Sequence, residues 1–261
     1  MNGDRFQPLV LCYHAVSDSW PDRLTVGPEM LERQLRSLLR RRYRPAGADS
    51  VLGGSGKLLH VTFDDAYRSV AKAMPVLERL RVPATVFACT SFADDGRVLD
   101  VPELALEAAK YPDELATMSW DELESLVERG IEVGSHTVTH AHLTRLSDAD
   151  LKKELQESRE RLEARLGRPC RYLAYPYGEE DARVRASARA AGYVAAFGLP
   201  GSEKPVDRYS VPRIGVWRSD NLLRFTIKTV TLTRRLARAA PWLIPRGKQR
   251  VPPAPAAGAP P

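Results

Sequence analysis

One short apolar run ends in two adjacent carboxylates, and this arrangement constrains the fold more than any other part of the chain. Leu58–Phe63 follows a Gly/Ser-rich stretch and leads directly into Asp64 and Asp65. The run predicts a buried strand, and the following segment, 67–81, is helix-like. A strand, an acid pair and a helix in this order are typical of an α/β active site at the carboxyl end of a strand.

The acid pair has two interpretations, a cation site and a helix cap. Two neighbouring carboxylates repel each other unless a positive charge lies between them or one of them is protonated. A metal ion would relieve the repulsion by binding one acid and leaving the other as a base. The alternative is that Asp64 and Asp65 cap the following helix, and this alternative would be preferred if the pair stood alone.

A histidine pair shifts the balance towards a metal site. His136 and His140 follow the strand-like run Ile131–Val133, and a spacing of four places two side chains on one face of a helical turn. With Asp65 they offer two nitrogens and one oxygen, a set that leaves a position for water as in catalytic zinc sites. We therefore predict one divalent ion held by Asp65, His136 and His140, with zinc favoured by ligand type and nickel or cobalt as substitutes.

A third stretch combines a strand-like run with turn residues. Arg171–Gly178 predicts a strand that runs into a tight turn, with Pro176 and Gly178 as its breakers. A backbone N–H at such a turn can point into a cleft and stabilise an oxyanion. An ordinary strand-to-helix loop is the alternative.

In this order, the three stretches resemble the motifs of the polysaccharide deacetylase family, the carbohydrate esterases with NodB homology. Thr62–Asp65 is similar to the first motif, Ser135–His140 to the second and Tyr175–Gly178 to the end of the third. The resemblance covers about residues 9–225. It implies a distorted, incomplete (β/α)7–8 barrel, and the roughly seven βα units indicated by the hydrophobic pattern agree with this.

The resemblance also implies an activity and roles for the residues. It implies a metal-dependent hydrolase, acting on carbon–nitrogen bonds other than peptide bonds, that removes N-acetyl groups from a carbohydrate. Asp64 would be the general base, and the Tyr177 backbone N–H would stabilise the oxyanion. Tyr175, Pro176 and Tyr177 would contact the sugar.

Two departures from the family pattern bear on the catalytic groups. Ala174 stands where the third motif often has an arginine that holds the catalytic aspartate, and the late Leu-x-His motif is missing because no histidine follows His142. We predict that His14, at the end of the strand-like run Leu9–Tyr13, replaces the missing acid. The pair Tyr13-His14 resembles a Tyr-His pair near the start of a subgroup that deacetylates poly-N-acetylglucosamine. His60 is predicted to be buried structure, and His142 to face away from the site.

Two other functions stay open at this point. One is a different carbon–nitrogen hydrolase on the same scaffold, acting on a small amide or a cyclic ureide. The other is a catalytically inactive module that binds carbohydrate or metal, which the two departures favour and the retention of Asp64 opposes.

Composition bounds the class of protein. With 261 residues, of which 43% are hydrophobic, one domain with a sizeable core is feasible. Three cysteines at irregular spacing predict buried free thiols in a reducing compartment. No signal peptide is evident, so a cytoplasmic location is expected, and no recognised nucleic-acid motif accompanies the charge.

The basic charge lies in the C-terminal part of the chain. The chain has a net charge of +6, while residues 221–261 contain eight Lys or Arg and no Asp or Glu. We expect a barrel over 1–225, a basic amphipathic segment over 226–250 and a disordered Pro/Ala-rich tail over 251–261. The basic segment suits either peripheral contact with an anionic membrane or, as we prefer, a last barrel helix with a solvated basic end.

Overall fold

A single parallel sheet organises the protein in the computed structural model, which describes residues 8–199 and 207–230. Within these residues all strand pairs are parallel, in the order β8-β7-β6-β5-β4-β3-β1-β9, with β2 also pairing with β3. The strands are β1 (Leu9–Tyr13), β2 (Arg44–Pro45), β3 (Leu58–Phe63), β4 (Ala84–Ala88), β5 (Glu132–Ser135), β6 (Tyr172–Ala174), β7 (Ala195–Gly198), β8 (Val211–Pro212) and β9 (Ile214–Gly215).

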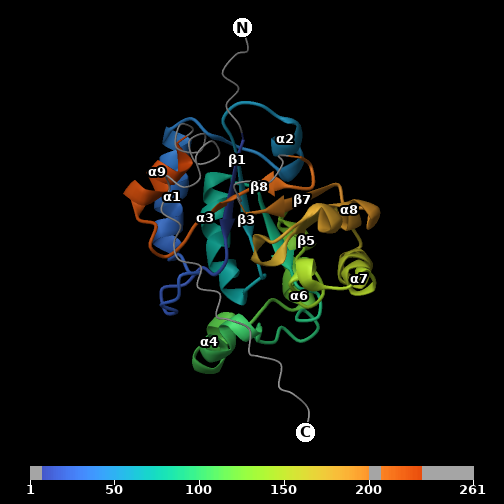
Figure 1. Cartoon of the computed structure of the whole chain (residues 1–261). Helices are drawn as coiled ribbons and strands as arrows, with labels where there is room; N and C mark the ends of the chain where they lie inside the picture. The colour runs from blue at the N-terminus through green and yellow to red at the C-terminus, as the bar shows by residue number, and fades with distance from the viewer. Residues whose placement is uncertain (1–7, 200–206, 231–261) are drawn as a thin grey trace.

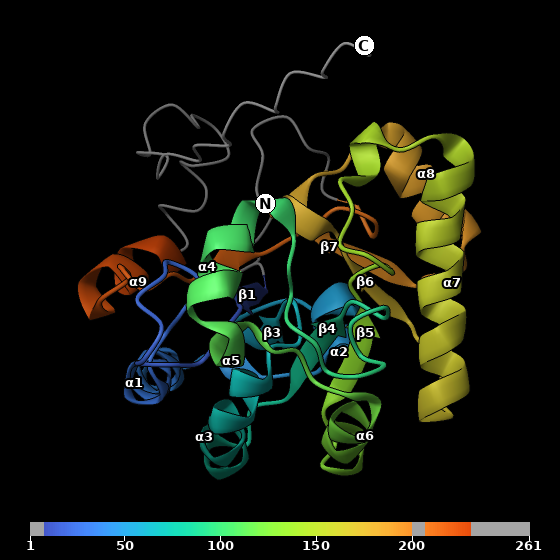
Figure 2. The same ribbon diagram turned by 90° about the horizontal axis from the view of Figure 1, so that it is seen from below.

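Helices surround this sheet (Figures 1 and 2). The α-helices are α1 (Pro28–Arg40), α2 (Ala48–Gly53), α3 (Met74–Leu80), α4 (Ala105–Lys110), α5 (Pro112–Leu115), α6 (Trp120–Glu128), α7 (Asp148–Leu166), α8 (Ala182–Ala190) and α9 (Leu222–Thr229). Short 3-10 helices are η1 (Arg68–Ala73), η2 (Pro102–Leu104), η3 (Leu143–Arg145) and η4 (Pro176–Gly178). The arrangement is the expected distorted, incomplete barrel.

A two-part seam brings the ends of the sheet together. The sequence pattern predicts one strand over 211–217, but the segment divides into β8, which pairs with β7, and β9, which pairs with β1 at the opposite edge. Only Arg213 separates the two pieces; its N–H donates to the Gly198 carbonyl at 3.1 Å, whereas Val216 N–H donates to the Cys12 carbonyl at 2.8 Å. The segment is divided because it crosses the gap between the two edges of an incomplete barrel.

Capping residues mark the ends of two helices. Ser119 and Glu122 form a capping box at the start of α6. Ser147 caps α7, which ends at Gly167 in the left-handed conformation with φ of 62°. The single helix expected over 67–81 is instead η1 followed by α3, because Pro75 in the first turn of α3 cannot donate a helical hydrogen bond.

The last described helix belongs to the barrel. Phe225 of α9 is fully buried, and the Thr229 hydroxyl accepts a hydrogen bond of 2.7 Å from Arg41, just beyond α1. Both figures show α9 beside α1. This agrees with the preferred interpretation for residues 222–229, while the expected basic and Pro/Ala-rich segments beyond residue 230 lie outside the described residues. No helix among the described residues has the length and apolar character needed to cross a membrane.

His60 is a buried structural residue, as predicted, with 1% of its surface exposed. Its Nδ1 lies 2.9 Å from the Ala46 carbonyl and its Nε2 lies 2.9 Å from the Thr85 hydroxyl, so one nitrogen donates and the other accepts. Burial lowers the pKa of His60 to about 4, although the hydrogen bond to Ala46 opposes this shift. The neutral ring is therefore the form that fits the fold.

This burial predicts a loss of stability in mild acid. Between pH 6.5 and about 4, the unfolded state takes up a proton on His60 that the folded state does not bind, so the free energy of unfolding falls as the pH falls. We expect about 2 kcal/mol less stability from this group at pH 5 than at pH 7. Denaturant unfolding of wild type and His60→Gln at both pH values measures it. Equal pH dependence in the two proteins would contradict the prediction.

Candidate active site

The predicted residues gather at one end of the barrel. Because all the strands are parallel, their carboxyl ends meet at the same side of the sheet, where barrel active sites lie. Five of the predicted residues follow the ends of strands or lie in the loops just beyond them: His14 after β1, Asp64 and Asp65 after β3, and His136 and His140 after β5. Tyr177 follows β6.

Asp65, His136 and His140 form a buried three-ligand group. The Asp65 Oδ1 atom lies 3.4 Å from His136 Nε2 and 3.3 Å from His140 Nε2, and the three residues are 4%, 2% and 8% exposed. Among the described residues, Asp65 Oδ1 is buried without a hydrogen-bond partner. A buried carboxylate oxygen facing two imidazole nitrogens is a suitable donor set for a divalent cation, so these residues fit the predicted metal ion.

A hydrogen bond fixes the orientation of one ligand. His136 Nδ1 donates to the Ala174 carbonyl at 2.8 Å, so Nε2 is the ring nitrogen that faces Asp65 and is available to a metal ion. Burial by itself would raise the pKa of Asp65, but the two histidines together outweigh it and hold this pKa well below its ordinary value. The carboxylate is therefore ionised, as a metal ligand must be.

The local backbone differs from the expectation for both motifs. His136 directly follows β5, and the segment to His140 is a loop with φ of 72° at Thr137 and 62° at His140, so the predicted helical turn is wrong. The loop nevertheless brings the two rings to a centroid separation of 5.0 Å. Asp65 also has a positive φ, 67°, and neither acid caps η1, which begins after Tyr67 without a side-chain cap.

Asp64 is held by a residue that sequence reasoning missed. Arg213, in the seam between β8 and β9, donates through Nη1 to Asp64 Oδ1 at 2.6 Å and through Nη2 to Oδ2 at 2.8 Å. Both side chains are almost fully buried, with Arg213 1% and Asp64 3% exposed. Nη1 also donates to the Thr62 hydroxyl at 3.1 Å, which fixes the guanidinium on strand β3. The pair is therefore a two-point ion pair with a defined geometry.

Arg213 explains how the chain tolerates Ala174. The Arg213 guanidinium holds Asp64, the predicted base, in place of the arginine that the third motif lacks. Burial would raise the pKa of Asp64, but the charges of Arg213 and His136 together outweigh it and keep this pKa below its ordinary value. No local pattern distinguishes Arg213 from the chain's other arginines, and only the closing of the barrel brings it within reach of Asp64.

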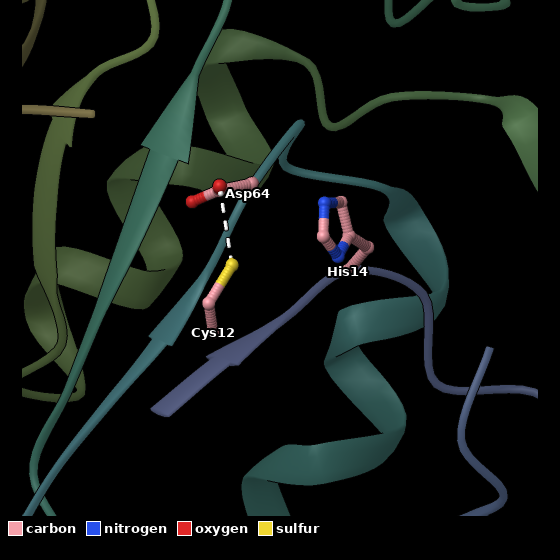
Figure 3. Close-up of side chains that lie close together, drawn as sticks. All are labelled: Cys12, His14 and Asp64. Carbon is pink, nitrogen blue, oxygen red and sulfur yellow. Dashed lines mark hydrogen bonds between the residues drawn. The ribbon is translucent and has the colours of Figure 1, made fainter. Parts of the chain in front are cut away.

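His14 and Cys12 lie near Asp64 (Figure 3). The Cys12 thiol donates to Asp64 Oδ2 at 3.3 Å, and one ligand-type atom from each of Cys12, His14 and Asp64 lies within 4.8 Å of the others. Burial raises the pKa of Cys12 well above its ordinary value, so the thiol is protonated. With Arg213 on both oxygens of Asp64, this group is a poor second cation site.

The His14 ring is packed in place. It stacks on Trp217 with 5.4 Å between ring centroids, and its Nδ1 is buried without a hydrogen-bond partner among the described residues. Burial lowers the pKa of His14, while the charges of Asp65 and Asp64 oppose this shift. The imidazole is thus placed near the predicted base but makes no ion pair with it.

The turn after β6 has the predicted tight form. Tyr177 adopts φ of 58° and ψ of 3°, and Gly178 also has a positive φ, of 66°. The Tyr175 side chain is fully buried and its hydroxyl donates to the Tyr209 carbonyl at 2.9 Å; Pro176 is also buried. Contact of Tyr175 and Pro176 with a sugar stays a prediction, and their side chains support the turn. Tyr177 packs its ring edge-on to His140, with centroids 4.6 Å apart.

A family comparison agrees with this geometry. Residues 53–196, just over half of the chain, match the family model described as polysaccharide deacetylase. The chain belongs to the polysaccharide deacetylase family. The match contains the acid pair, both histidines and the Tyr177 turn, whereas His14 and Arg213 lie outside it.

Individual members of the polysaccharide deacetylase family show the same relationship. YxkH of Bacillus subtilis (strain 168), which carries the provisional name of a polysaccharide deacetylase, is 23% identical over 192 residues, covering 70% of this chain and 61% of YxkH. The chain thus spans less than two thirds of that relative. IcaB from Ammonifex degensii is 25% identical with a TM-score of 0.69, covering 86% of this chain and 98% of IcaB. A polysaccharide deacetylase from Bacillus cereus is 25% identical with a TM-score of 0.67, covering 86% of this chain and 69% of the Bacillus cereus protein.

Proposed function

We propose that this protein is a metal-dependent hydrolase that removes N-acetyl groups from a carbohydrate. The observation that carries the proposal is the pairing of two neighbouring acids with different partners. Asp65 faces two imidazoles in a metal-type group, while Asp64 is bound by Arg213 instead. One acid is therefore available as a ligand and the other as a base, within a family described as deacetylases.

Asp65, His136 and His140 would hold the divalent ion. Such an ion would polarise the amide carbonyl and lower the pKa of a bound water, two effects that an unreactive amide requires. Two nitrogens and one oxygen suit zinc, with nickel and cobalt as substitutes, because imidazole is a good ligand for all three metals.

The remaining residues would move protons and stabilise charge. Asp64, kept ionised and oriented by Arg213, would take the proton from the attacking water. The Tyr177 backbone N–H would donate a hydrogen bond to the developing oxyanion. His14 would protonate the nitrogen of the departing amine; because burial lowers the pKa of His14, its protonated form is a stronger acid than free imidazolium.

The proposed function is tested by measuring free amine released from N-acetylated oligosaccharides. We expect release by the metal-loaded protein, loss of release after chelation and recovery when zinc is added back. Amine release from small amides or cyclic ureides but not from any N-acetylated sugar would favour another carbon–nitrogen hydrolase. Binding of sugar or metal without turnover on any of these substrates would favour an inactive binding module.

The ligand assignment predicts a loss of metal in two variants. His136→Ala and His140→Ala each remove one of three proposed protein ligands, so both purified proteins should contain much less than one ion per chain, whereas the wild type should contain about one. Elemental analysis after dialysis measures this. His60→Gln is a suitable control because it changes a buried histidine away from the carboxyl ends of the strands. Full occupancy in both ligand variants would contradict the assignment.

A further inference from the structure

Four side chains outside the proposed metal group form a connected cluster around the Tyr177 turn. The Glu103 carboxylate accepts a hydrogen bond of 2.9 Å from the Tyr177 hydroxyl and lies 3.0 Å from His142 Nε2. His142 Nδ1 lies 3.0 Å from Glu179. The His142 ring also stacks on the Tyr177 ring, with centroids 3.8 Å apart and planes 7° from parallel. We call Glu103, His142, Tyr177 and Glu179 the rim clamp.

The rim clamp corrects one sequence-based expectation. His142 was predicted to face away from the site because it is two residues beyond His140. The left-handed backbone at His140 redirects the chain, so the His142 ring lies against Tyr177, whose ring in turn packs on His140. The clamp therefore adjoins the proposed metal group.

The clamp joins three separate parts of the chain. Glu103 lies in η2, within the long excursion between β4 and β5, whereas His142 lies in the loop after β5. Tyr177 and Glu179 lie in the turn after β6. The side chains of Glu103, His142 and Glu179 are 32%, 18% and 34% exposed, so the clamp stands at the rim rather than in the core.

The backbone at the centre of the clamp needs support. Tyr177 has a positive φ without being glycine, a conformation that persists only where the surroundings determine it. Three contacts to this one side chain fix it: the stacked His142 ring, the edge-on His140 ring and the Glu103 carboxylate. Because a side chain and its own N–H share one Cα, fixing the ring also limits rotation of the peptide that carries the N–H.

We propose that Glu103 and His142 are positioning residues that hold the Tyr177 turn in the conformation needed for oxyanion stabilisation. This inference rests on the proposed function. The excursion between β4 and β5 thereby contributes to the site through Glu103 without touching the reacting atoms. The carboxylates of Glu103 and Glu179 both contact His142, and they thereby hold its ring against Tyr177.

Kinetics on two substrates test the proposal. Glu103→Ala and Tyr177→Phe each remove the hydrogen bond between Glu103 and Tyr177, and we expect kcat to fall about tenfold in each, less than the full loss of an oxyanion donor. The fall should be equal for an N-acetylated oligosaccharide and for an aryl acetate, because both pass through an oxyanion. KM and metal content should not change, and the double variant should be no worse than either single variant. Asp100→Asn, an exposed acid in the same excursion, is the matched control.

Other outcomes would overturn the proposal. A higher KM with unchanged kcat would make the clamp a substrate-binding subsite, and additive losses in the double variant would mean that the two groups act independently. Unchanged kcat in both variants would also refute it. Glu103→Gln, which keeps an acceptor for the Tyr177 hydroxyl, should recover most of the activity lost in Glu103→Ala.

A measurement without turnover separates this inference from the proposed function. Hydrogen exchange of the peptide covering 175–179 reports on the Gly178 and Glu179 amides, which bond the Tyr175 and Pro176 carbonyls at 2.9 and 3.1 Å. Exchange should be several-fold faster in Glu103→Ala than in wild type or Asp100→Asn. Equal exchange in all three proteins would refute the clamp even if the enzyme proved active, and faster exchange would support it even if no sugar were deacetylated.

Discussion

Asp64→Asn is expected to lower turnover by roughly two to four orders of magnitude while the protein keeps its metal, the usual scale for losing a general base. An amide side chain cannot take the proton from the attacking water, although it has nearly the same shape as the carboxylate. Because Asp64 makes its ion pair with Arg213 and not with the histidines, the ligand group should survive the change. Single-turnover amine release together with elemental analysis measures both properties.

The neighbouring acid provides the matched comparison. Asp65→Asn should weaken metal binding first, and added metal should restore part of its activity; added metal should not restore Asp64→Asn. Asp64→Asn leaves the buried Arg213 without its counter-ion, so the unfolding of this variant must also be measured. A fall of about 3–5 kcal/mol in its free energy of unfolding would be consistent with the broken pair. Identical metal content and identical kinetics in the two variants would contradict the division of roles.

His14→Ala is expected to remove most of the amidase activity, on the order of a hundredfold or more, and to leave the metal bound. An amine must be protonated as the carbon–nitrogen bond breaks, because an amide anion is far too basic to leave. His14 lies close to Asp64, and its ring is held by stacking on Trp217. Steady-state kinetics on an N-acetylated oligosaccharide measure the loss.

An ester substrate distinguishes this role from a structural one. The phenolate of an aryl acetate leaves with little protonation, so its hydrolysis should suffer much less in His14→Ala than amide hydrolysis does. This pattern differs from the equal losses expected for the rim clamp. Equal loss on both substrates would indicate a structural or metal role for His14, and no loss on either would exclude it from the mechanism.

The sequence predicted that Asp65, His136 and His140 lie together because the signal for each of them is local. Asp65 follows a strand-like run, and the two histidines sit close together after another, so parallel strands bring them to one edge whatever the details of the loops. The detailed conformation between His136 and His140 was not predictable from spacing alone. The positive φ values at Thr137 and His140 replace a helical turn with a loop, and they also redirect His142 towards Tyr177.

Arg213 could not be predicted because its role depends on the closing of the barrel. It lies 149 residues from Asp64, and its flanking sequence predicts one continuous strand. Neither hydrophobic periodicity nor turn residues mark the point at which β8 leaves one edge of the sheet and β9 joins the other. The sequence shows that position 174 has no arginine. That Arg213 takes the place of this arginine is visible only in the folded chain.

Because Arg213 lies in the seam, the closing of the barrel and the orientation of Asp64 depend on the same short segment. Two strands of two residues each are a weak join between the edges of the sheet, and the residue at the join is also the one that orients Asp64. A fluctuation that separates the edges would withdraw the guanidinium before the surrounding helices lose their packing. The orientation of the proposed base therefore depends on a short join in the barrel, so we expect heat or denaturant to abolish activity while most of the secondary structure is still intact.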